Sequence, residues 1–429
     1  MVGQGGLAGA AGGTAGASSG GAGGSLGGAG GIATGGVGTG GVGTGGIGTG
    51  GIGTGGIGTG GLGTGGGNAG AGGMGGSSAP QEFEFTIASG LRHTCLVKAG
   101  RIYCWGDNSY GQLGIDGLSV ALVPVAVPGI SDARVVAAGN VHTCAIRQGG
   151  QVLCWGGSAA GDPRLGRGDT ATGVGELSGF NASAISAGFV STCAITGTTV
   201  NCWGYADFGV LGNNSAVPSS APTPVVGLTN AVAVSVGPTG HACAVVTPDR
   251  RVYCWGRNAS GALGDRTTMD SGVPVLVQNL AGAAKVAAGS YSTCALLVTG
   301  QVTCWGDNSS GALGDGTMME RLDPVTPSID DVKVLRAGNG HWCAVQNSGH
   351  VACWGQNGSH QTGSSQDGNV LAPFIVPGLS DVVAVSGGTG FTCARRQTGD
   401  VSCWGTNNMG QLGNSTVAPT TTPTRVMLP

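Results

Sequence analysis

The sequence Arg101-Ile102-Tyr103-Cys104-Trp105-Gly106 ends in the tripeptide that decides the fold of this chain, because Cys-Trp-Gly occurs seven times. The seven copies follow one another at intervals of 48 to 52 residues, and a second cysteine precedes each by 9 to 11 residues. A period of about 50 residues is typical of solenoids and propellers. The tripeptides begin at Cys104, Cys154, Cys202, Cys254, Cys304, Cys353 and Cys403, and the preceding cysteines are Cys95, Cys144, Cys193, Cys243, Cys294, Cys343 and Cys393.

The spacing of the cysteines predicts a hairpin in every repeat. We interpret each repeat as four short strands, of which the second carries the first cysteine and the third carries Cys-Trp-Gly. If the two cysteines face each other, two repeats are left with two-residue turns, four with three-residue turns that end in glycine, and one with the four-residue turn 247–250. The turn absorbs each insertion while the cysteines stay opposed. The pattern therefore predicts one disulfide within each hairpin.

Two other states of the cysteines remain open from the sequence. Zinc ligands are usually two to four residues apart, and the chain has no Cys-x-x-Cys, so a zinc site is the weaker interpretation. Reduced, buried cysteines are the second alternative. Paired cysteines favour an oxidising compartment and hence a secreted or cell-surface protein, although no signal peptide is visible at the N-terminus.

The composition changes abruptly at Glu82 and divides the chain in two. Residues 1–81 contain no charged and no aromatic residue, so we predict a disordered, glycine- and threonine-rich low-complexity linker there. Residues 82–429 are predicted to fold as one domain. A net charge of −3 with only three lysines argues against a nucleic-acid partner, and no apolar run has the length of a membrane helix. We expect a monomer.

Seven four-stranded units predict an all-β fold, a seven-bladed β-propeller with one disulfide per blade. Short turns join the proline-containing strand of each repeat to the next apolar strand, whereas about 15 residues separate it from Cys-Trp-Gly. Tight connections belong within a sheet, so we predict that each blade begins at the proline-containing strand. The C-terminal strand at Pro423–Leu428 would then pair beside Phe83–Ala88 and close the ring.

Two further sets of residues are predicted to be structural. The tryptophan of each Cys-Trp-Gly points to the strand face opposite the cysteine, where it would pack between adjacent blades. For Trp342, which lies outside the motif, an exposed position is the alternative. Four histidines share one repeat position, and hydrogen bonding is the more economical interpretation than a ring of metal ligands. They are His93, His142, His241 and His341.

The repeats resemble the regulator of chromosome condensation family. The resemblance rests on His93-Thr94-Cys95-Leu96, on Gly100–Gly106 and on Asn108–Gly114, with close copies of the last at Asn308–Gly314 and Asn407–Gly413. It covers roughly residues 83–429 and implies a seven-bladed propeller that serves as a binding platform, not an enzyme. The founding member promotes nucleotide exchange on a small GTPase and binds chromatin. A second branch, with a secreted bacterial inhibitor of β-lactamases, clamps another protein, and this chain looks more like that branch.

The sequence contains no recognisable catalytic motif, metal motif or cofactor motif, so we expect a non-catalytic protein without cofactors. Its first predicted function is to bind a protein partner through the long loops. A carbohydrate- or envelope-binding module, which would need clustered exposed aromatic residues, is the alternative, and a nucleotide-exchange regulator is the third. The candidate partner-binding residues in the loops are Tyr110, Tyr205, Phe208, Arg266, Met269, Met318, Met319, Arg321 and His360.

Overall fold

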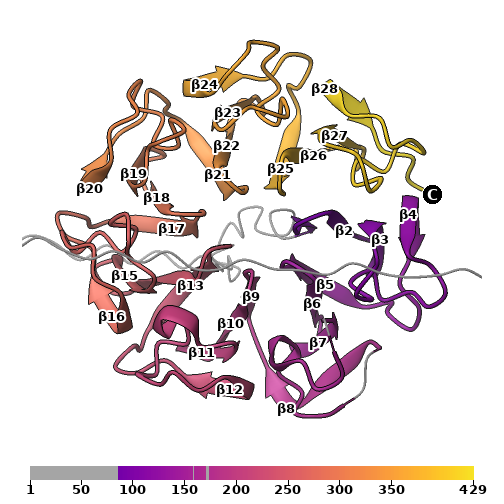
Figure 1. Ribbon diagram of the computed structural model, residues 1–429, viewed down its shortest axis with the longest axis horizontal. Helices are drawn as coiled ribbons and strands as arrows, with labels where there is room; N and C mark the ends of the chain where they lie inside the picture. Colours follow the sequence, from indigo (N-terminus) through magenta and orange to yellow (C-terminus); the bar gives the residue numbers. More distant parts are fainter. Residues whose placement is uncertain (1–85, 158, 171–172) are drawn as a thin grey trace, which may run out of the picture. The chain divides into compact units, whose positions relative to one another are not determined.

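The computed structural model describes residues 86–429 except residues 158 and 171–172. These residues form seven antiparallel four-stranded sheets arranged as blades around a ring (Figure 1). The predicted seven-bladed propeller is therefore confirmed. The linker predicted at residues 1–81 lies outside the described residues.

Each blade consists of four strands in chain order from the central channel outward. The inner strands are β1 (Ile87–Ser89), β5 (Ala133–Ala138), β9 (Ala184–Ala187), β13 (Ala231–Val236), β17 (Ala283–Ala288), β21 (Val332–Ala337) and β25 (Val382–Gly387). The second strands are β2 (His93–Lys98), β6 (His142–Arg147), β10 (Ser191–Thr196), β14 (His241–Val246), β18 (Ser292–Leu297), β22 (His341–Gln346) and β26 (Phe391–Arg396). The third strands are β3 (Arg101–Asp107), β7 (Gln151–Gly156), β11 (Thr199–Gly204), β15 (Arg251–Gly256), β19 (Val302–Gly306), β23 (Val351–Gly355) and β27 (Val401–Gly405). The outer strands are β4 (Val120–Ala126), β8 (Gly175–Asn181), β12 (Ser219–Pro224), β16 (Ser271–Leu276), β20 (Arg321–Val325), β24 (Val370–Ile375) and β28 (Thr420–Arg425). Two short 3₁₀ helices, η1 (Pro163–Leu165) and η2 (Asp207–Gly209), lie in the loops before β8 and β12.

The hairpin between the second and third strands has the predicted register in every blade. Cys95 pairs with Cys104 and Cys193 with Cys202 across two-residue turns, and the other five pairs are equally opposed. All seven pairs are disulfide-bonded, with Cα–Cα distances of 4.0 to 4.1 Å. The described part of the chain has no free cysteine. The prediction of one disulfide per blade is confirmed.

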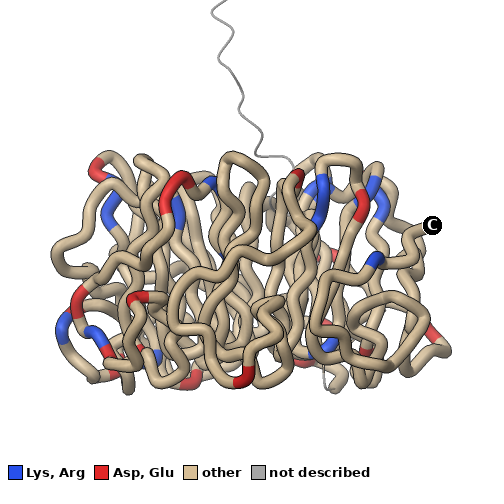
Figure 2. Tube along the Cα trace, turned by 90° about the horizontal axis from the view of Figure 1, so that it is seen from above, with Lys and Arg blue, Asp and Glu red and all other residues tan. Residues whose placement is uncertain are grey.

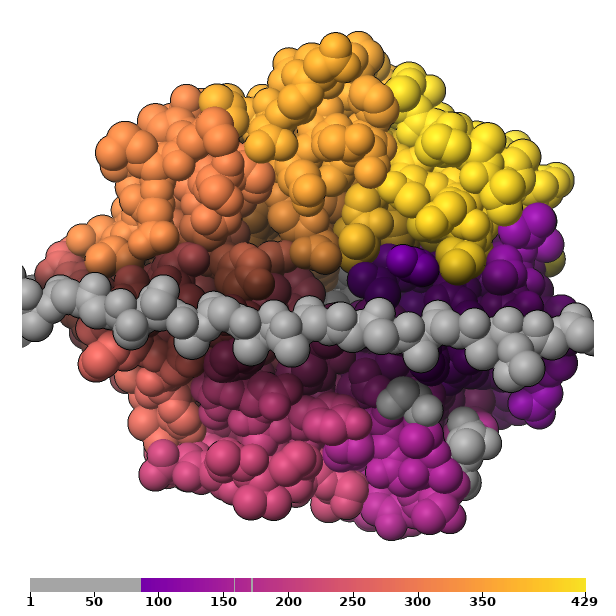
Figure 3. Space-filling model, in the orientation of Figure 1, coloured from indigo at the N-terminus to yellow at the C-terminus, as the bar shows by residue number. Residues whose placement is uncertain are grey.

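The predicted blade boundaries are wrong. The proline-containing strand pairs with the Cys-Trp-Gly strand that precedes it, as β28 pairs with β27, and it forms the outer edge of its own blade. No strand from the C-terminus pairs beside β1, because β1 pairs only with β2 among the described strands. The ring closes instead by side-chain packing between the first and last blades, which Figure 3 shows side by side in indigo and yellow.

The long loop can belong to a sheet because a buried asparagine folds it compactly. In the fifth blade the Asn308 side chain accepts a hydrogen bond from the Leu313 amide and donates to the Thr317 carbonyl. Asn258 and Asn407 make the same pair of contacts with their own loops, and Asn108 accepts from the Leu113 amide and donates to the Ile115 and Leu118 carbonyls. The loop thus turns back on itself within about ten residues. It therefore spans a much shorter distance than its number of residues would allow, and the strand after it can pair with the strand before it.

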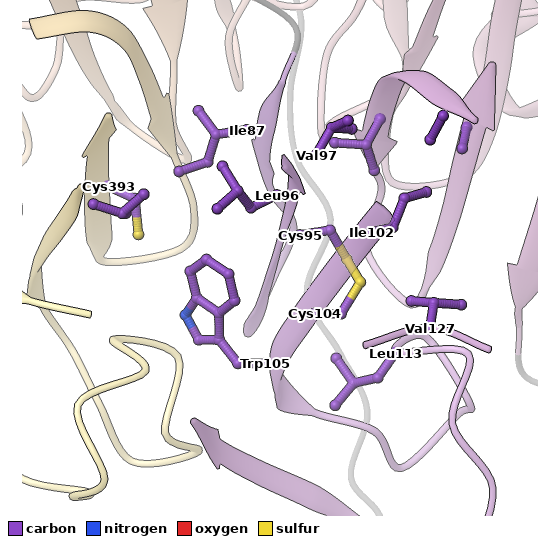
Figure 4. Close-up of a cluster of buried hydrophobic side chains, with 14 of the residues drawn as sticks. Ile87, Cys95, Leu96, Val97, Ile102, Cys104, Trp105, Leu113, Val127 and Cys393 are labelled. Atoms are coloured by element: carbon purple, nitrogen blue, oxygen red, sulfur yellow. A yellow bond between two sulfur atoms is a disulfide. The ribbon is translucent and has the colours of Figure 1, made fainter. Parts of the chain in front are cut away.

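The tryptophan of each Cys-Trp-Gly is fully buried between two blades, as predicted. Its indole N–H donates to a backbone carbonyl in the long loop of the preceding blade, at 2.8 to 3.0 Å in all seven cases. Trp105 donates to the Gln411 carbonyl and so repeats this contact across the closure of the ring. Figure 4 shows the Trp105 ring on the side of the last blade and the Cys95–Cys104 disulfide on the other side of the strands.

The glycine of the tripeptide is required by its backbone geometry. All seven have φ between 88° and 115°, a region that side chains rarely adopt. A Cβ at these positions would lie 2.4 to 2.7 Å from the carbonyl oxygen of the residue that precedes the second strand of the same blade. The motif therefore combines one cysteine of the disulfide, a tryptophan that packs between blades and a strand position whose backbone conformation only glycine adopts.

The four histidines are structural, as predicted. The Nε2 atom of each lies 2.8 to 3.0 Å from a threonine hydroxyl of the next blade, and all four side chains are buried. Burial lowers the pKa of His93, His241 and His341 to about 4. Burial, together with the positive charge of Arg164, lowers the pKa of His142 to about 3. The imidazoles are neutral at pH 7.

The exposed position considered for Trp342 is wrong, because the side chain is only 1% exposed. The fifth blade has Ser292 where four others have histidine, and the sixth has Trp342 where the histidine's threonine partner would lie. The indole donates to the Ser292 hydroxyl at 3.3 Å. One large and one small residue thus fill the volume that a histidine–threonine pair fills elsewhere.

The antiparallel order gives the ring two chemically different faces. The turns between first and second strands and the long loops between third and fourth strands lie together on what we name the loop face. The cysteine hairpins and the linkers between blades form the hairpin face. Figure 2 shows the ring edge-on, with most of its charged residues near one face or the other.

Candidate functional site

A cavity of about 520 Å³ opens on the loop face, at the mouth of the central channel. The turns between the first and second strands of all seven blades, together with the ends of the first strands, contribute to its lining, and half of these residues are glycine or alanine. Three larger residues beyond those turns also line it, namely Asp207, Phe208 and Arg257 from the long loops of the third and fourth blades. The small residues leave space for the cavity, and the three larger residues add an acidic, an aromatic and a basic side chain on one side of it.

The distinctive feature of this mouth is an arginine that lies between two exposed aromatic residues, with a third exposed aromatic residue lining the same cavity. We name Phe189, Phe208, Arg257 and Tyr291 the mouth cluster. The Arg257 guanidinium carbon lies 4.6 Å from the Phe208 ring centroid and 5.1 Å from that of Tyr291. The three aromatic side chains are 37% to 46% exposed. A cation between two aromatic rings holds all three side chains in place while their outer surfaces stay open to solvent.

The backbone of three successive blades positions the mouth cluster. Phe208 belongs to η2 in the third blade and has a left-handed φ of 58°, which directs it toward the fourth blade. There it packs beside Gly240, where a Cβ would lie 3.2 Å from the ring. The Arg257 amide donates to the Gly240 carbonyl at 2.9 Å. The cluster thus spans a blade boundary on a fixed backbone.

Hydrogen bonds between blades also hold the turns around the mouth. The Ser290 hydroxyl donates to the Asn339 side-chain oxygen at 2.5 Å, and the Asn339 amide side chain donates to Thr389 at 3.3 Å. On the other side of the ring, the Asn140 backbone N–H donates to the Gly188 carbonyl at 3.2 Å. These contacts link neighbouring turns, so the mouth is a preformed surface.

Of the nine residues predicted to bind a partner, only Phe208 lines this cavity. Tyr205 lies close by on the third blade, with the Arg164 guanidinium carbon 5.4 Å from its ring. Tyr110 is 47% exposed on the loop of the first blade. His360 lies in the loop of the sixth blade, with its Nδ1 atom 3.2 Å from the Ser364 carbonyl.

The remaining predicted residues form a second exposed region on the loops of the fourth and fifth blades. Met269, Met318 and Met319 are 54% to 72% exposed. Arg266 forms an ion pair with Asp323 of the next blade at 2.8 Å, and Arg321 pairs with Asp315 at 3.1 Å. Since both arginines already have carboxylate partners, they are less available to a ligand than the sequence suggested.

Three residues of the mouth cluster were missed from the sequence. Phe189 and Tyr291 lie in the short turns after the first strands, and only the long loops had been considered. Their signal was present, because both are large residues in turns that are otherwise rich in glycine, asparagine and serine. Arg257 immediately follows Cys-Trp-Gly, a position taken as part of the structural motif.

Neither a metal site nor a membrane span emerges from the described residues. Within 86–429, apart from the three omitted positions, no three His, Cys, Asp or Glu side chains are grouped as potential metal ligands. No helix in the same part of the chain is long and apolar enough to cross a membrane.

Comparison with known proteins identifies the repeats. Two models of the regulator of chromosome condensation (RCC1) repeat match this chain, one at residues 99–146 and 249–296, the other at 134–161, 231–262, 283–312 and 382–411. The chain is similar to human E3 ubiquitin-protein ligase HERC2, with 31% identity over 220 residues, which is 48% of this chain and 4% of HERC2. It is also 30% identical over 203 residues to the Arabidopsis thaliana ultraviolet-B receptor UVR8, covering 45% of this chain and 46% of the receptor. The matches span less than half the length of these curated relatives.

Solved structures show the same fold at low sequence identity. Prp20p of Saccharomyces cerevisiae aligns over 78% of this chain and 87% of its own, with a TM-score of 0.69 and 19% identity. Human WBSCR16 aligns over 70% of this chain and 84% of its own, with a TM-score of 0.62 and 22% identity. Yeast RCC1 (Prp20) has also been solved bound to Kap60, and that chain aligns with a TM-score of 0.69 and 19% identity, over 80% of this chain and 85% of its own.

Proposed function

On the premise that this chain is a seven-bladed propeller of RCC1 repeats, we propose that it is a non-catalytic binding platform that engages a protein partner through the mouth cluster. Yeast RCC1 (Prp20), which has the same fold, has been solved bound to Kap60, so a protein with this fold can form a complex with another protein. A ring with a preformed mouth suits that role. Its surface residues are already ordered by folding, so binding a partner costs little conformational entropy.

The observation that carries the proposal is Arg257 held between Phe208 and Tyr291. Tyrosine and arginine are enriched at the energetic centres of protein interfaces, where they bury large areas at little conformational cost. The hollow beside them has room for one or two side chains of a partner. Aromatic rings left 37% to 46% exposed beside such a hollow would gain stability by being covered.

We propose that the protein acts outside the cytosol, either secreted or at the cell surface. Seven disulfides are typical of chains that fold in an oxidising compartment. A cytosolic exchange factor would have to keep these bonds in a reducing environment. The nucleotide-exchange alternative is therefore disfavoured, and exchange on small GTPases is the simple assay that would revive it.

Carbohydrate binding is the second candidate, and the same cluster favours it. Exposed aromatic rings beside a hollow can stack on sugar rings, and Phe189, Phe208 and Tyr291 line one such hollow. The two candidates differ in what they recover from envelope and secreted fractions of the source organism. A protein partner gives one stoichiometric polypeptide, whereas a glycan gives sugar without protein.

The test is affinity capture with the oxidised full chain and two matched double variants. Phe208→Ala/Tyr291→Ala removes the aromatic walls of the mouth cluster. Met269→Ala/Met318→Ala removes two exposed apolar residues of the outer loops and serves as the control. We expect the first variant to lose at least ten-fold in affinity for the captured protein and the control to keep it. Equal loss in both variants, or capture of glycan alone, would contradict the proposal.

A further inference from the structure

Arg257 occupies a position at which the fold uses only the backbone. It follows Cys-Trp-Gly in the fourth blade, and its backbone N–H donates to the Gly240 carbonyl, just before the second strand. The residue after Cys-Trp-Gly makes the same contact in the other six blades, at 2.8 or 2.9 Å. These six residues are Asp107, Gly157, Tyr205, Asp307, Gln356 and Thr406. Since even glycine serves here, the fold does not require the arginine side chain.

The charge of Arg257 is accommodated differently from that of other arginines on the loop face. Four of those arginines form ion pairs with aspartates at 2.6 to 3.4 Å, namely Arg164–Asp162, Arg167–Asp169, Arg266–Asp323 and Arg321–Asp315. Among the described residues, no ion pair joins Arg257 to a carboxylate. Its guanidinium lies against the rings of Phe208 and Tyr291 instead. Aromatic faces attract a cation without using its N–H groups, so these donors stay available to a ligand.

A carboxylate is the group that fits these donors best. The planar guanidinium presents its N–H groups as a fork that matches the two oxygen atoms of a carboxylate. The Arg257 side chain is partly buried between the two rings, so water screens its charge less than that of a fully exposed arginine. A carboxylate that covers it would form a well-ordered ion pair.

Asp207 restricts the charge of the ligand. It is the only acidic residue that lines this cavity in the described part of the chain, and it precedes Phe208 in η2. Its repulsion of an anion in the cavity is proportional to the charge of that anion. A phosphate group, with nearly two negative charges, is therefore repelled about twice as strongly as a single carboxylate.

Apolar surface surrounds the same side of the cavity. Ala187, Val190, Val236, Pro238 and Ala288 line it from the third, fourth and fifth blades, next to the exposed rings of the mouth cluster. The cavity of about 520 Å³ has room for a large side chain. A ligand that brings a carboxylate to Arg257 can therefore bury an apolar group beside it.

Resting on the proposed function, we propose that the partner inserts into the mouth a projecting segment in which an aspartate or glutamate lies beside a large apolar residue. The carboxylate pairs with Arg257, and the apolar side chain enters the hollow against Phe208 and Tyr291. The partner removes this ion pair from water, so the loss of either charge leaves the other buried and lowers the affinity.

The test uses a phage-displayed library of short disulfide-constrained peptides, selected on the oxidised full chain. Peptides that no longer bind Phe208→Ala/Tyr291→Ala are specific for the mouth, and we expect them to share an acidic residue next to an aromatic or large aliphatic one. Each is then synthesised with that acidic residue or with its amide, and the affinities are measured by isothermal titration calorimetry. The amide should weaken binding to the unmodified chain at least ten-fold, and less than two-fold to Arg257→Gln.

Three further variants separate the effects of charge, geometry and position. Arg257→Lys keeps the charge but loses the planar fork, so its affinity for the acidic peptides should lie between those of the unmodified chain and Arg257→Gln. Asp207→Asn removes a repulsive charge and should strengthen the binding of acidic peptides while leaving their amide forms unchanged. Arg266→Gln removes an arginine of the outer loops, which pairs with Asp323, and should leave both affinities unchanged.

The outcomes separate this inference from the function on which it rests. Mouth-specific peptides without an acidic residue, or with one that its amide replaces without loss, would overturn the inference and leave the proposed function standing. If no selected peptide depends on Phe208 and Tyr291, the result contradicts both. Displacement of the peptides by glucuronate, at concentrations where glutamate has no effect, would assign Arg257 to an acidic sugar and overturn the inference as well.

Discussion

The glycine that ends each Cys-Trp-Gly offers a direct test of the motif at the level of one residue. Gly306 has φ of 100°, and a Cβ there would lie 2.5 Å from the Tyr291 carbonyl oxygen. Gly306→Ala therefore combines an unfavourable φ with a collision, and we expect a loss of about 3 kcal/mol or more in unfolding free energy. Gly316→Ala is the control, because Gly316 has φ of 80° with nothing within 4 Å of the added Cβ. Denaturant titration should give about 1–2 kcal/mol for it, and equal losses would show that the collision is unimportant.

Ser292 and Trp342 test the exchange of partners across one blade boundary. Trp342→Thr removes a buried indole, and the resulting cavity should cost about 3–5 kcal/mol. Ser292→His/Trp342→Thr installs the histidine–threonine pair found at four other boundaries, so it should recover a clear part of that loss. The measurement is chemical denaturation of both variants and of Ser292→His alone. A double variant no more stable than Trp342→Thr would mean that the pair is not interchangeable.

At the scale of the element, the cysteine hairpin is the unit whose stability can be measured separately. Each disulfide closes a loop of 9 to 11 residues, which constrains the unfolded chain by about 2–3 kcal/mol. We expect Cys294→Ser/Cys304→Ser to lose about that amount. The same change in a blade that is not a neighbour, Cys95→Ser/Cys104→Ser, should add to it, because repeat proteins are stabilised by nearest-neighbour contacts. Strong non-additivity in denaturant titrations would indicate coupling around the whole ring.

The hairpins were predictable and the blade boundaries were not, for a physical reason. A hairpin is local, so the cysteine spacing and the final glycine of its turn determine its register, as in Cys294 and Cys304. Which sheet an outer strand joins depends on the distance that its loop spans. Contacts within the loop, such as the hydrogen bond from the Leu313 amide to the Asn308 side chain, set that distance. The number of residues in the loop does not reveal it.

At the scale of the whole molecule, sequence order gives little information about the site. The mouth cluster joins Phe189, Phe208, Arg257 and Tyr291 from three successive blades, and only Phe208 was predicted. The loops identified from the sequence lie on the loop face as expected, but the turns that also reach that face were overlooked. Convergence at the channel is a property of ring closure, since it brings the turns of all seven blades together.

Ring closure also makes the molecule sensitive to acid in a way that no single blade would be. Four of the seven boundaries contain a buried neutral histidine bonded to a threonine of the next blade. Their pKa values are about 3 to 4 in the folded protein and about 6.5 when unfolded, so the unfolded chain binds more protons between these limits. The stability is fully present above pH 6.5 and is lost as the pH falls toward 4. Each histidine should cost roughly 2 kcal/mol between pH 7 and pH 5.

Denaturant titrations at pH 7 and pH 5 measure this loss directly. His341→Phe reproduces the side chain that the seventh blade has at this position, Phe391, and it should remove about one quarter of the pH-dependent loss that the four histidines together cause. Thr392 would keep its second contact, the bond that it donates to the Gln361 carbonyl at 2.7 Å. His350→Gln changes an exposed histidine and should leave the pH dependence unaltered. If the unmodified protein were equally stable at both pH values, the histidines would have to be protonated in the folded ring, with each inter-blade hydrogen bond donated by an imidazolium.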